Sequence, residues 1–205
     1  MKKFLMALVA VSLFVPAMAR AQMFTATVTG QATGFISPGD QLDGEYGGIV
    51  YAGTLDGVTP LFVTRCDYGF TWNPDTNACE GTRSYIVWQT LPLTITGASS
   101  LTDGAANTAI LAVRTDTPAA RYCANLAPPD VNSHGYSDWY LPAKNEMNVI
   151  YTNRVAIGGF ATSNYWTSSE YDTNNPWAMR FSDGIWLYQN SKNQPIFVRC
   201  SRKGN

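Results

Sequence analysis

The chain has 205 residues, of which 45% are hydrophobic, 14% charged and 13% aromatic, and its formal net charge is −1. This composition suits a single globular domain and excludes a disordered chain or a coiled coil. A weakly acidic chain also lacks the basic surface of a nucleic-acid-binding protein. The single histidine, His134, excludes a zinc centre built from several imidazoles.

Residues 1–21 have the three parts of a secretory signal peptide. Lys2 and Lys3 supply positive charge, an apolar segment covers residues 4–15, and Ala19-Arg20-Ala21 supplies a cleavage site. A helix over that apolar segment reaches about 18 Å, too short for a hydrocarbon core of about 30 Å. We therefore predict a secreted bacterial protein, located outside the cell, at its surface or in the periplasm, with no membrane span and cleavage near Ala21.

The cysteines are expected to form disulfides in an oxidising compartment. There are four, which allow three pairings: Cys66, Cys79, Cys123 and Cys200. Turn residues at Gly69 and 73–75 can fold the first two cysteines together. We predict a Cys66–Cys79 bridge, which leaves Cys123–Cys200. A metal site would need close Cys-x-x-Cys pairs, and the sequence has none.

Short strands and two helices are predicted for the rest of the chain. The first helix begins at Pro118, after a capping Thr117, and ends before Pro128. The second begins at Pro142 and ends at Gly158. Strands are expected at residues 25–29, 48–53, 61–64, 84–89, 93–96, 177–181, 186–188 and 196–200. We divide the chain into an N-terminal arm (22–43) and one domain (44–203) with a disulfide-closed excursion at 66–79.

Four blocks in the second half resemble the Lcl C-terminal domain family. They are GYSDWYLPAKNEM at 135–147, YWTSSE at 165–170, WAMRFSDG at 177–184 and VRCSR at 198–202. The resemblance implies an α+β domain of C-type-lectin-like fold, loop-rich, with two helices packed on a small twisted antiparallel sheet. It also implies distant kinship with formylglycine-generating enzymes and with retroelement variable proteins. The founding member of the family is implicated in adhesion through glycosaminoglycans.

No catalytic residue, cofactor or metal is predicted. Asp138 and Glu146 are expected to fix a turn and the start of the second helix, rather than to form a catalytic carboxylate pair. Ser133 and His134 lie next to each other without the strained turn or oriented partner of a catalytic triad. Calcium-dependent lectins use a Gln-Pro-Asp type triplet. Here Ile196 replaces the acid after Gln194-Pro195, so we expect calcium-independent binding.

The candidate ligand site lies in residues 168–192. This segment is rich in Tyr, Trp, Ser and Asn, the side chains typical of adaptable recognition surfaces. We expect Trp177, Met179 and Phe181 to face the core together with Ile185 and Leu187, which turns two aromatic side chains outward next to an arginine. The predicted ligand-binding residues are Tyr171, Asp172, Asn174, Asn175, Arg180, Trp186, Tyr188, Asn190 and Lys192.

The predicted function is that of a non-catalytic, adhesin-like binding module whose partner is a glycan or a surface protein. Three alternatives stay open: an enzyme related to formylglycine-generating oxidases, a structural tip or coat component, and a polar loop region that binds nothing. The first alternative requires reactive cysteines. Oligomeric state and the role of residues 22–43 are left undecided by the sequence.

Overall fold

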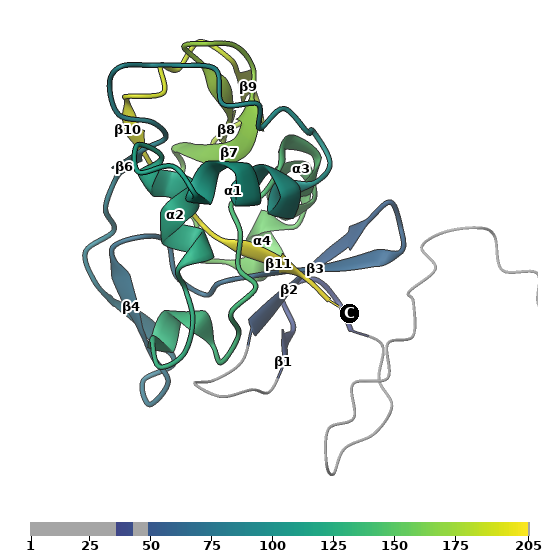
Figure 1. Ribbon diagram of the computed structural model, residues 1–205. Helices are drawn as coiled ribbons and strands as arrows, with labels where there is room; N and C mark the ends of the chain where they lie inside the picture. The colour runs from purple at the N-terminus through teal and green to yellow at the C-terminus, as the bar shows by residue number, and fades with distance from the viewer. Residues whose placement is uncertain (1–35, 43–48, 205) are drawn as a thin grey trace, which may run out of the picture.

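The computed structural model describes residues 36–42 and 49–204, so the predicted signal peptide and the strand at 25–29 lie outside the described residues. A four-stranded antiparallel sheet has the order β1-β2-β3-β11 (Figure 1). Its strands are β1 (Gln41–Leu42), β2 (Ile49–Leu55), β3 (Thr59–Val63) and β11 (Ser201–Lys203). Residues 41 and 42, which are predicted to be part of the N-terminal arm, thus belong to the main sheet.

A second antiparallel sheet has the order β7-β8-β9 and carries most of the predicted ligand segment. It comprises β7 (Asn164–Glu170), β8 (Pro176–Arg180) and β9 (Trp186–Leu187). Two smaller pairs complete the strands: β4 (Phe70–Asn73) with β5 (Ala78–Gly81), and β6 (Ile86–Val87) with β10 (Pro195–Ile196). The strand predicted at 93–96 does not form. Instead, this segment hydrogen-bonds to side chains such as that of Glu170.

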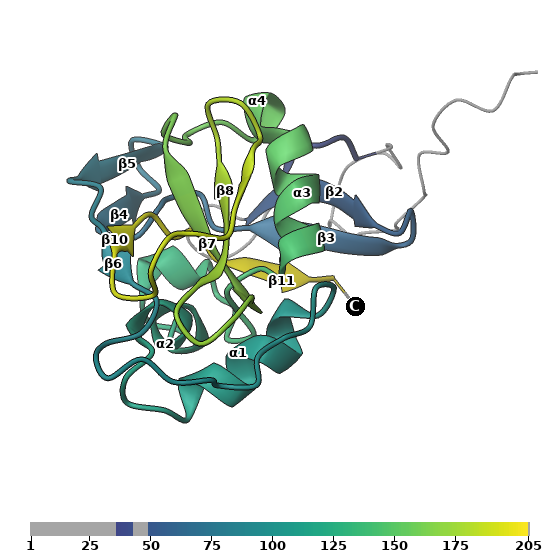
Figure 2. The same cartoon turned by 90° about the horizontal axis from the view of Figure 1, so that it is seen from above.

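The described residues contain four α-helices, two more than predicted: α1 (Gly104–Ala112), α2 (Pro118–Ala124), α3 (Lys144–Thr152) and α4 (Arg154–Ile157). A short 3₁₀ helix also covers Val131–Ser133. The first predicted helix corresponds to α2, and the second is divided into α3 and α4. Figure 2 shows α1 and α2 on one side of the sheets and α3 and α4 on the other. The fold is therefore mixed helix and sheet, as expected.

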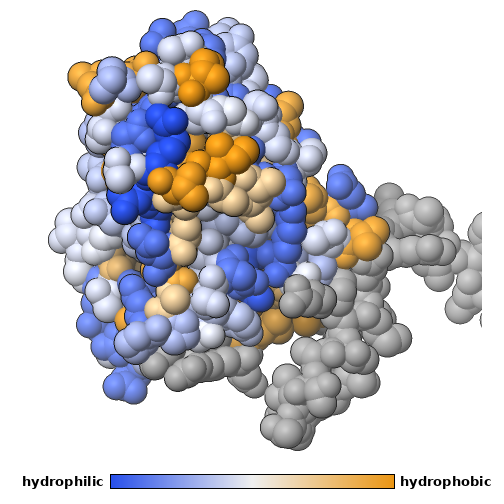
Figure 3. All heavy atoms as spheres, viewed as in Figure 1, coloured by the Kyte–Doolittle hydropathy of each residue, from blue (hydrophilic) through white to orange (hydrophobic). Residues whose placement is uncertain are grey.

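Helix α1 is unusual because its polar side chains face inward. Asn107 and Thr108 are buried, and they hydrogen-bond to Ser100 and Leu141. The opposite face of the helix is apolar and exposed, as the hydrophobic surface over α1 in Figure 3 shows. A sequence pattern that places apolar residues inward therefore misses this helix.

Both predicted disulfides are present, so all four cysteines are paired. Cys66–Cys79 closes the segment that carries β4 and β5, and Cys123–Cys200 joins α2 to the chain just before β11. Cys123 and Cys200 are fully buried in the same core cluster as Trp166. The long bridge therefore passes through the interior, whereas the short one constrains a hairpin.

Candidate functional site

The candidate site is a group of four aromatic side chains joined by ring contacts, here called the aromatic face. Its members are Tyr171, Trp177, Trp186 and Tyr188. Ring centroids lie 5.0 Å apart for Tyr171 and Trp177, 5.2 Å for Tyr171 and Tyr188, and 5.8 Å for Trp177 and Tyr188. Tyr171 is 50% exposed and Tyr188 44%, whereas the two tryptophans are half-buried. The four rings therefore form one partly exposed aromatic surface.

The register of β8 and β9 explains this grouping. Trp186 pairs with Met179, and Leu187 pairs with Ala178. Directly opposed residues of an antiparallel pair share a face. Tyr188 therefore lies on the Trp177 side of the sheet. This is the side on which Met179 packs into the core cluster that includes Met147 and Ile150 of α3.

Helix α3 covers Met179 but begins too late to cover the aromatic face. Its first residue, Lys144, holds its ammonium group 3.5 Å from the ring centre of Trp177 and 5.1 Å from that of Trp186. This is cation–π geometry. Burial lowers the pKa of Lys144, because the charged form is partly removed from water. Lys144 thus supports one side of the rings and leaves the tyrosines uncovered.

The register corrects part of the prediction. Arg180 donates its backbone N–H to Ile185, so it lies on the sheet face opposite Trp186 rather than next to it. Its side chain is turned outward as expected, but it is paired with Asp183. Ile185 is 49% exposed, so the expectation that it packs in the core is wrong. The strand has only two paired residues, and alternation alone could not determine which face is buried.

The loop after β7 uses its polar side chains to hold its own shape. The Asp172 carboxylate accepts hydrogen bonds from the backbone N–H groups of Asn174 and Asn175, at 2.7 and 2.8 Å, and from the Asn175 amide. Partial burial acts to raise the pKa of Asp172, but these hydrogen bonds outweigh it and lower the pKa. Asp172 and Asn175 therefore position Tyr171, while the Asn174 side chain stays exposed.

Lys192 is fully buried, so its predicted place at the exposed rim is wrong. Its ammonium forms an ion pair with Glu170 and donates to the Thr94 carbonyl at 2.7 Å. A buried charge is retained only when it is paired and hydrogen-bonded. Lys192 meets this requirement through a partner 22 residues away, which local sequence does not reveal.

The same ion pair fastens together three loops, one of which carries Tyr171. The Glu170 carboxylate accepts hydrogen bonds from the backbone of Thr96 and Gly97, at 2.9 and 3.0 Å. The backbone N–H of Lys192 donates to Asn174 at 2.7 Å. Asn190, two residues earlier, is half-buried, and its amide nitrogen has no hydrogen-bond partner within the described residues. These contacts fix the segments that carry Tyr171 and Tyr188.

Two of the residues at this site were missed by sequence reasoning. The alternation with Met179 places Trp177 in the core, but α3 begins at Lys144, too late to cover its ring. Lys144 lies 33 residues before Trp177, and nothing in its local sequence indicates that it packs on tryptophan rings. Only the β8–β9 register combined with the start of α3 brings the two residues together.

Asp138 and Glu146 are both held by hydrogen bonds to other parts of the fold. Asp138 forms two hydrogen bonds with Arg202, at 2.7 and 2.9 Å. Glu146 is buried, and it accepts hydrogen bonds from the backbone N–H groups of Ala143 and Gly104. Burial raises the pKa of Glu146, and the Ala143 N–H opposes the shift. Within residues 36–42 and 49–204, no group of three His, Cys, Asp or Glu side chains is arranged to hold a metal ion.

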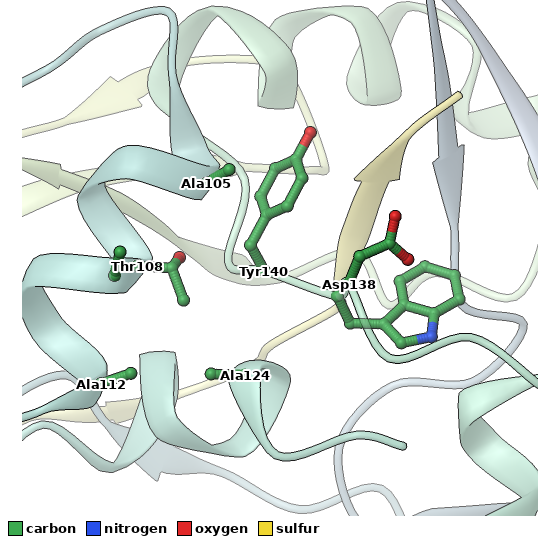
Figure 4. A pocket seen from close by; sticks show the side chains of 8 residues that line it. Ala105, Thr108, Ala112, Ala124, Asp138 and Tyr140 are labelled. Carbon is green, nitrogen blue, oxygen red and sulfur yellow. The ribbon is translucent and has the colours of Figure 1, made fainter. Parts of the chain in front are cut away.

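A cavity between α1 and α2 is a second candidate site. It is a cavity of about 290 Å³, lined mainly by small side chains. Figure 4 shows Ala105, Thr108 and Ala112 of α1 facing Ala124 of α2 and the segment with Asp138 and Tyr140. The only charged group lining it, Asp138, is engaged by Arg202. The cavity is at the lower limit of ligand pockets and offers few polar groups, so the aromatic face is the stronger candidate.

Comparison with protein families identifies the Lcl C-terminal domain over residues 62–202. The chain belongs to this family. The match covers more than half of the chain and includes the aromatic face, Lys144 and both cysteines of the long bridge. A comparison with curated proteins finds no match. None of the helices in the described part of the chain combines the length and apolar character needed to cross a bilayer.

Proposed function

We propose that this protein is an exported, non-catalytic binding module that recognises a glycan through the aromatic face. The observation that carries the proposal is the exposure of Tyr171 and Tyr188 against two half-buried tryptophans. Flat aromatic area stacks on the C–H faces of sugar rings, and tyrosine hydroxyls can hydrogen-bond to sugar hydroxyls at little entropic cost. The loops that the Glu170–Lys192 ion pair holds in place support a preformed binding site.

Export and a C-type-lectin-like fold are part of the same proposal. The N-terminal sequence supports export, and the two disulfides are consistent with an extracellular or periplasmic location. Paired helices against small antiparallel sheets support the lectin-like architecture implied by the family. Family membership also supports an adhesive role, with a surface glycan as the partner.

The proposal competes with an enzyme related to formylglycine-generating oxidases. Such an enzyme needs reactive cysteine thiols, whereas all four cysteines here are in disulfides. Titration of free thiols in the native protein separates the two functions. We expect no reactive thiol, and two reactive thiols in active protein would favour the enzyme.

A glycan array tests the proposal directly. We expect the purified protein to retain at least one class of saccharide, with the same signal in the presence of a chelator. The double variant Tyr171→Ala/Tyr188→Ala should lose that signal. Tyr85→Ala is the matched control, because Tyr85 is 59% exposed but stacks on Phe197 instead. Failure of the wild-type protein to bind any saccharide would refute a glycan ligand.

A further inference from the structure

Residues 90–97, between β6 and α1, form a loop that exposes aliphatic side chains and is here called the apolar loop. Leu91 is 68% and Ile95 58% exposed, and Pro92 is exposed between them. The sequence has no charged residue from position 84 to position 102. Figure 1 shows this part of the chain passing over the top of the molecule, where Figure 3 shows hydrophobic surface. Apolar side chains gathered on one surface indicate an interaction site.

Buried polar side chains hold the apolar loop in one conformation. The Gln89 amide donates a hydrogen bond to the Thr94 hydroxyl and accepts one from the Thr94 backbone N–H. Lys192 donates to the Thr94 carbonyl, and Glu170 accepts hydrogen bonds from two backbone N–H groups at the end of the loop. Gln89 and Lys192 are fully buried. The exposure of the aliphatic side chains is therefore a fixed property of the fold.

The charged side chains that contact the apolar loop are paired within the chain. Lys192 forms its ion pair with Glu170, and Arg114, which also donates to Thr94, forms one with Asp116. The loop itself therefore presents apolar area without net charge. Anionic lipid surfaces attract clusters of Lys and Arg. A zwitterionic lipid surface has no net charge and accepts aliphatic side chains below its headgroups, so it is the surface that this loop matches.

The aromatic face adjoins the apolar loop, because Tyr171 directly follows Glu170, which binds the loop. Tyrosine and tryptophan side chains are enriched at the level of the lipid headgroups in membrane proteins. We propose that the apolar loop inserts Leu91 and Ile95 into the surface of a zwitterionic lipid bilayer and places the aromatic face at the level of the headgroups. This inference rests on the proposed export of the protein but not on a glycan ligand.

Co-sedimentation of the purified protein with phosphatidylcholine vesicles tests the proposal. We expect the protein to bind reversibly, with little dependence on salt concentration, because the contact is apolar. Leu91→Asp and Ile95→Asp should each weaken vesicle binding at least tenfold, and the double variant should not bind. Both side chains are exposed, and circular dichroism checks that each variant folds. The double variant should keep the glycan-array signal of the wild-type protein, which separates this proposal from the proposed glycan ligand.

Val155→Asp is the matched control, since Val155 is 86% exposed but belongs to α4. It should bind vesicles as the wild-type protein does. A wild-type protein that stays in the supernatant at every lipid concentration overturns the proposal. Vesicle binding that persists in Leu91→Asp/Ile95→Asp also overturns it, because another surface then contacts the lipid. Binding that requires anionic lipid and is lost in salt would show an electrostatic contact and would equally exclude insertion of the loop.

Discussion

The buried tryptophans and the tryptophans of the aromatic face have different partners. Trp88, Trp139 and Trp166 are at most 3% exposed. Their indole N–H groups donate to backbone carbonyls at 2.8, 2.8 and 3.0 Å, respectively. Trp177 and Trp186 are half-buried, and their side chains contact other rings and Lys144, while Trp186 also packs against the edge of the core cluster that contains Met179.

The difference separates two roles for one residue type. A buried indole needs an acceptor for its N–H, because an unpaired buried donor is costly. Two of the three interior tryptophans thereby connect segments that are distant in sequence: Trp88 bonds to Thr167 and Trp166 to Ile86. The aromatic face uses ring contacts instead and stays partly in water. Substitutions in the interior should consequently change stability, and substitutions on the face should change binding.

The largest expected effect is the loss of stability on removing a disulfide. The two disulfides also differ in location, since one is in the interior and the other closes a hairpin. Removing the Cys123–Cys200 bridge by Cys→Ala substitution at both positions should lower the free energy of unfolding by about 4–5 kcal/mol, because it releases a loop closed over 77 residues. Removing Cys66–Cys79 should cost about 3 kcal/mol or less. Urea denaturation measures both. If removing Cys66–Cys79 lowered the free energy of unfolding more than removing Cys123–Cys200, the bridge in the hairpin and not the one in the interior would be the more stabilising, contrary to this prediction.

Trp166→Ala should be next in size. It removes a fully buried side chain and its hydrogen bond to Ile86, and should lower the free energy of unfolding by about 3–5 kcal/mol. Trp186→Ala is the matched substitution on the aromatic face and should shift the melting temperature little. Thermal unfolding of both variants gives the comparison. Equal destabilisation would mean that the aromatic face is part of the core.

Tyr188→Ala should weaken glycan binding by about 2 kcal/mol while leaving the protein folded. Central, partly exposed aromatic residues often dominate binding energy, and Tyr188 contacts both Tyr171 and Trp177. Titration calorimetry with a saccharide identified on the array measures the loss. Arg180→Ala should have little effect, because Arg180 lies on the opposite sheet face. If Arg180→Ala is the more damaging variant, the ligand binds there instead.

Lys144→Met should have the smallest effect. The substitution keeps an apolar chain over Trp177 but removes the ammonium, which is worth about 0.5–1 kcal/mol in cation–π contact. We expect a slight fall in melting temperature and modestly weaker binding, with Lys144→Arg close to wild type. Complete loss of binding in Lys144→Met would indicate that the ammonium contacts the ligand directly instead of supporting the rings.

Much of the fold could be predicted from sequence because its signals are local. Pro118 marks the start of α2, turn residues indicate the Cys66–Cys79 loop, and the four blocks identify the family. Helix α1 could not be predicted, because Asn107 and Thr108 face inward and hydrogen-bond to segments far along the chain. Of its larger apolar residues only Leu111 is buried, while Ile110, Ala105, Ala106 and Ala109 face outward, which departs from the pattern that identifies a helix.

The candidate site could be predicted in composition but not in arrangement. Tyr171, Trp186 and Tyr188 do come together, as the residue types of their segment suggested. Strand register then separates Arg180 from them, and a long-range ion pair buries Lys192. Both outcomes depend on contacts between strands and loops, for which a single sequence provides no signal.

The ion pair between Glu170 and Lys192 has a consequence for how a ligand would bind. Three loops converge on this one pair, so none of them can move far without breaking a hydrogen bond in an interior of low dielectric constant. A sugar arriving at Tyr171 and Tyr188 would meet rings that are already held in place. Binding would therefore restrict the motion of the sugar but would order no further protein backbone. The entropy lost on binding should come mainly from the sugar, as it does when a molecule adsorbs to a rigid solid surface.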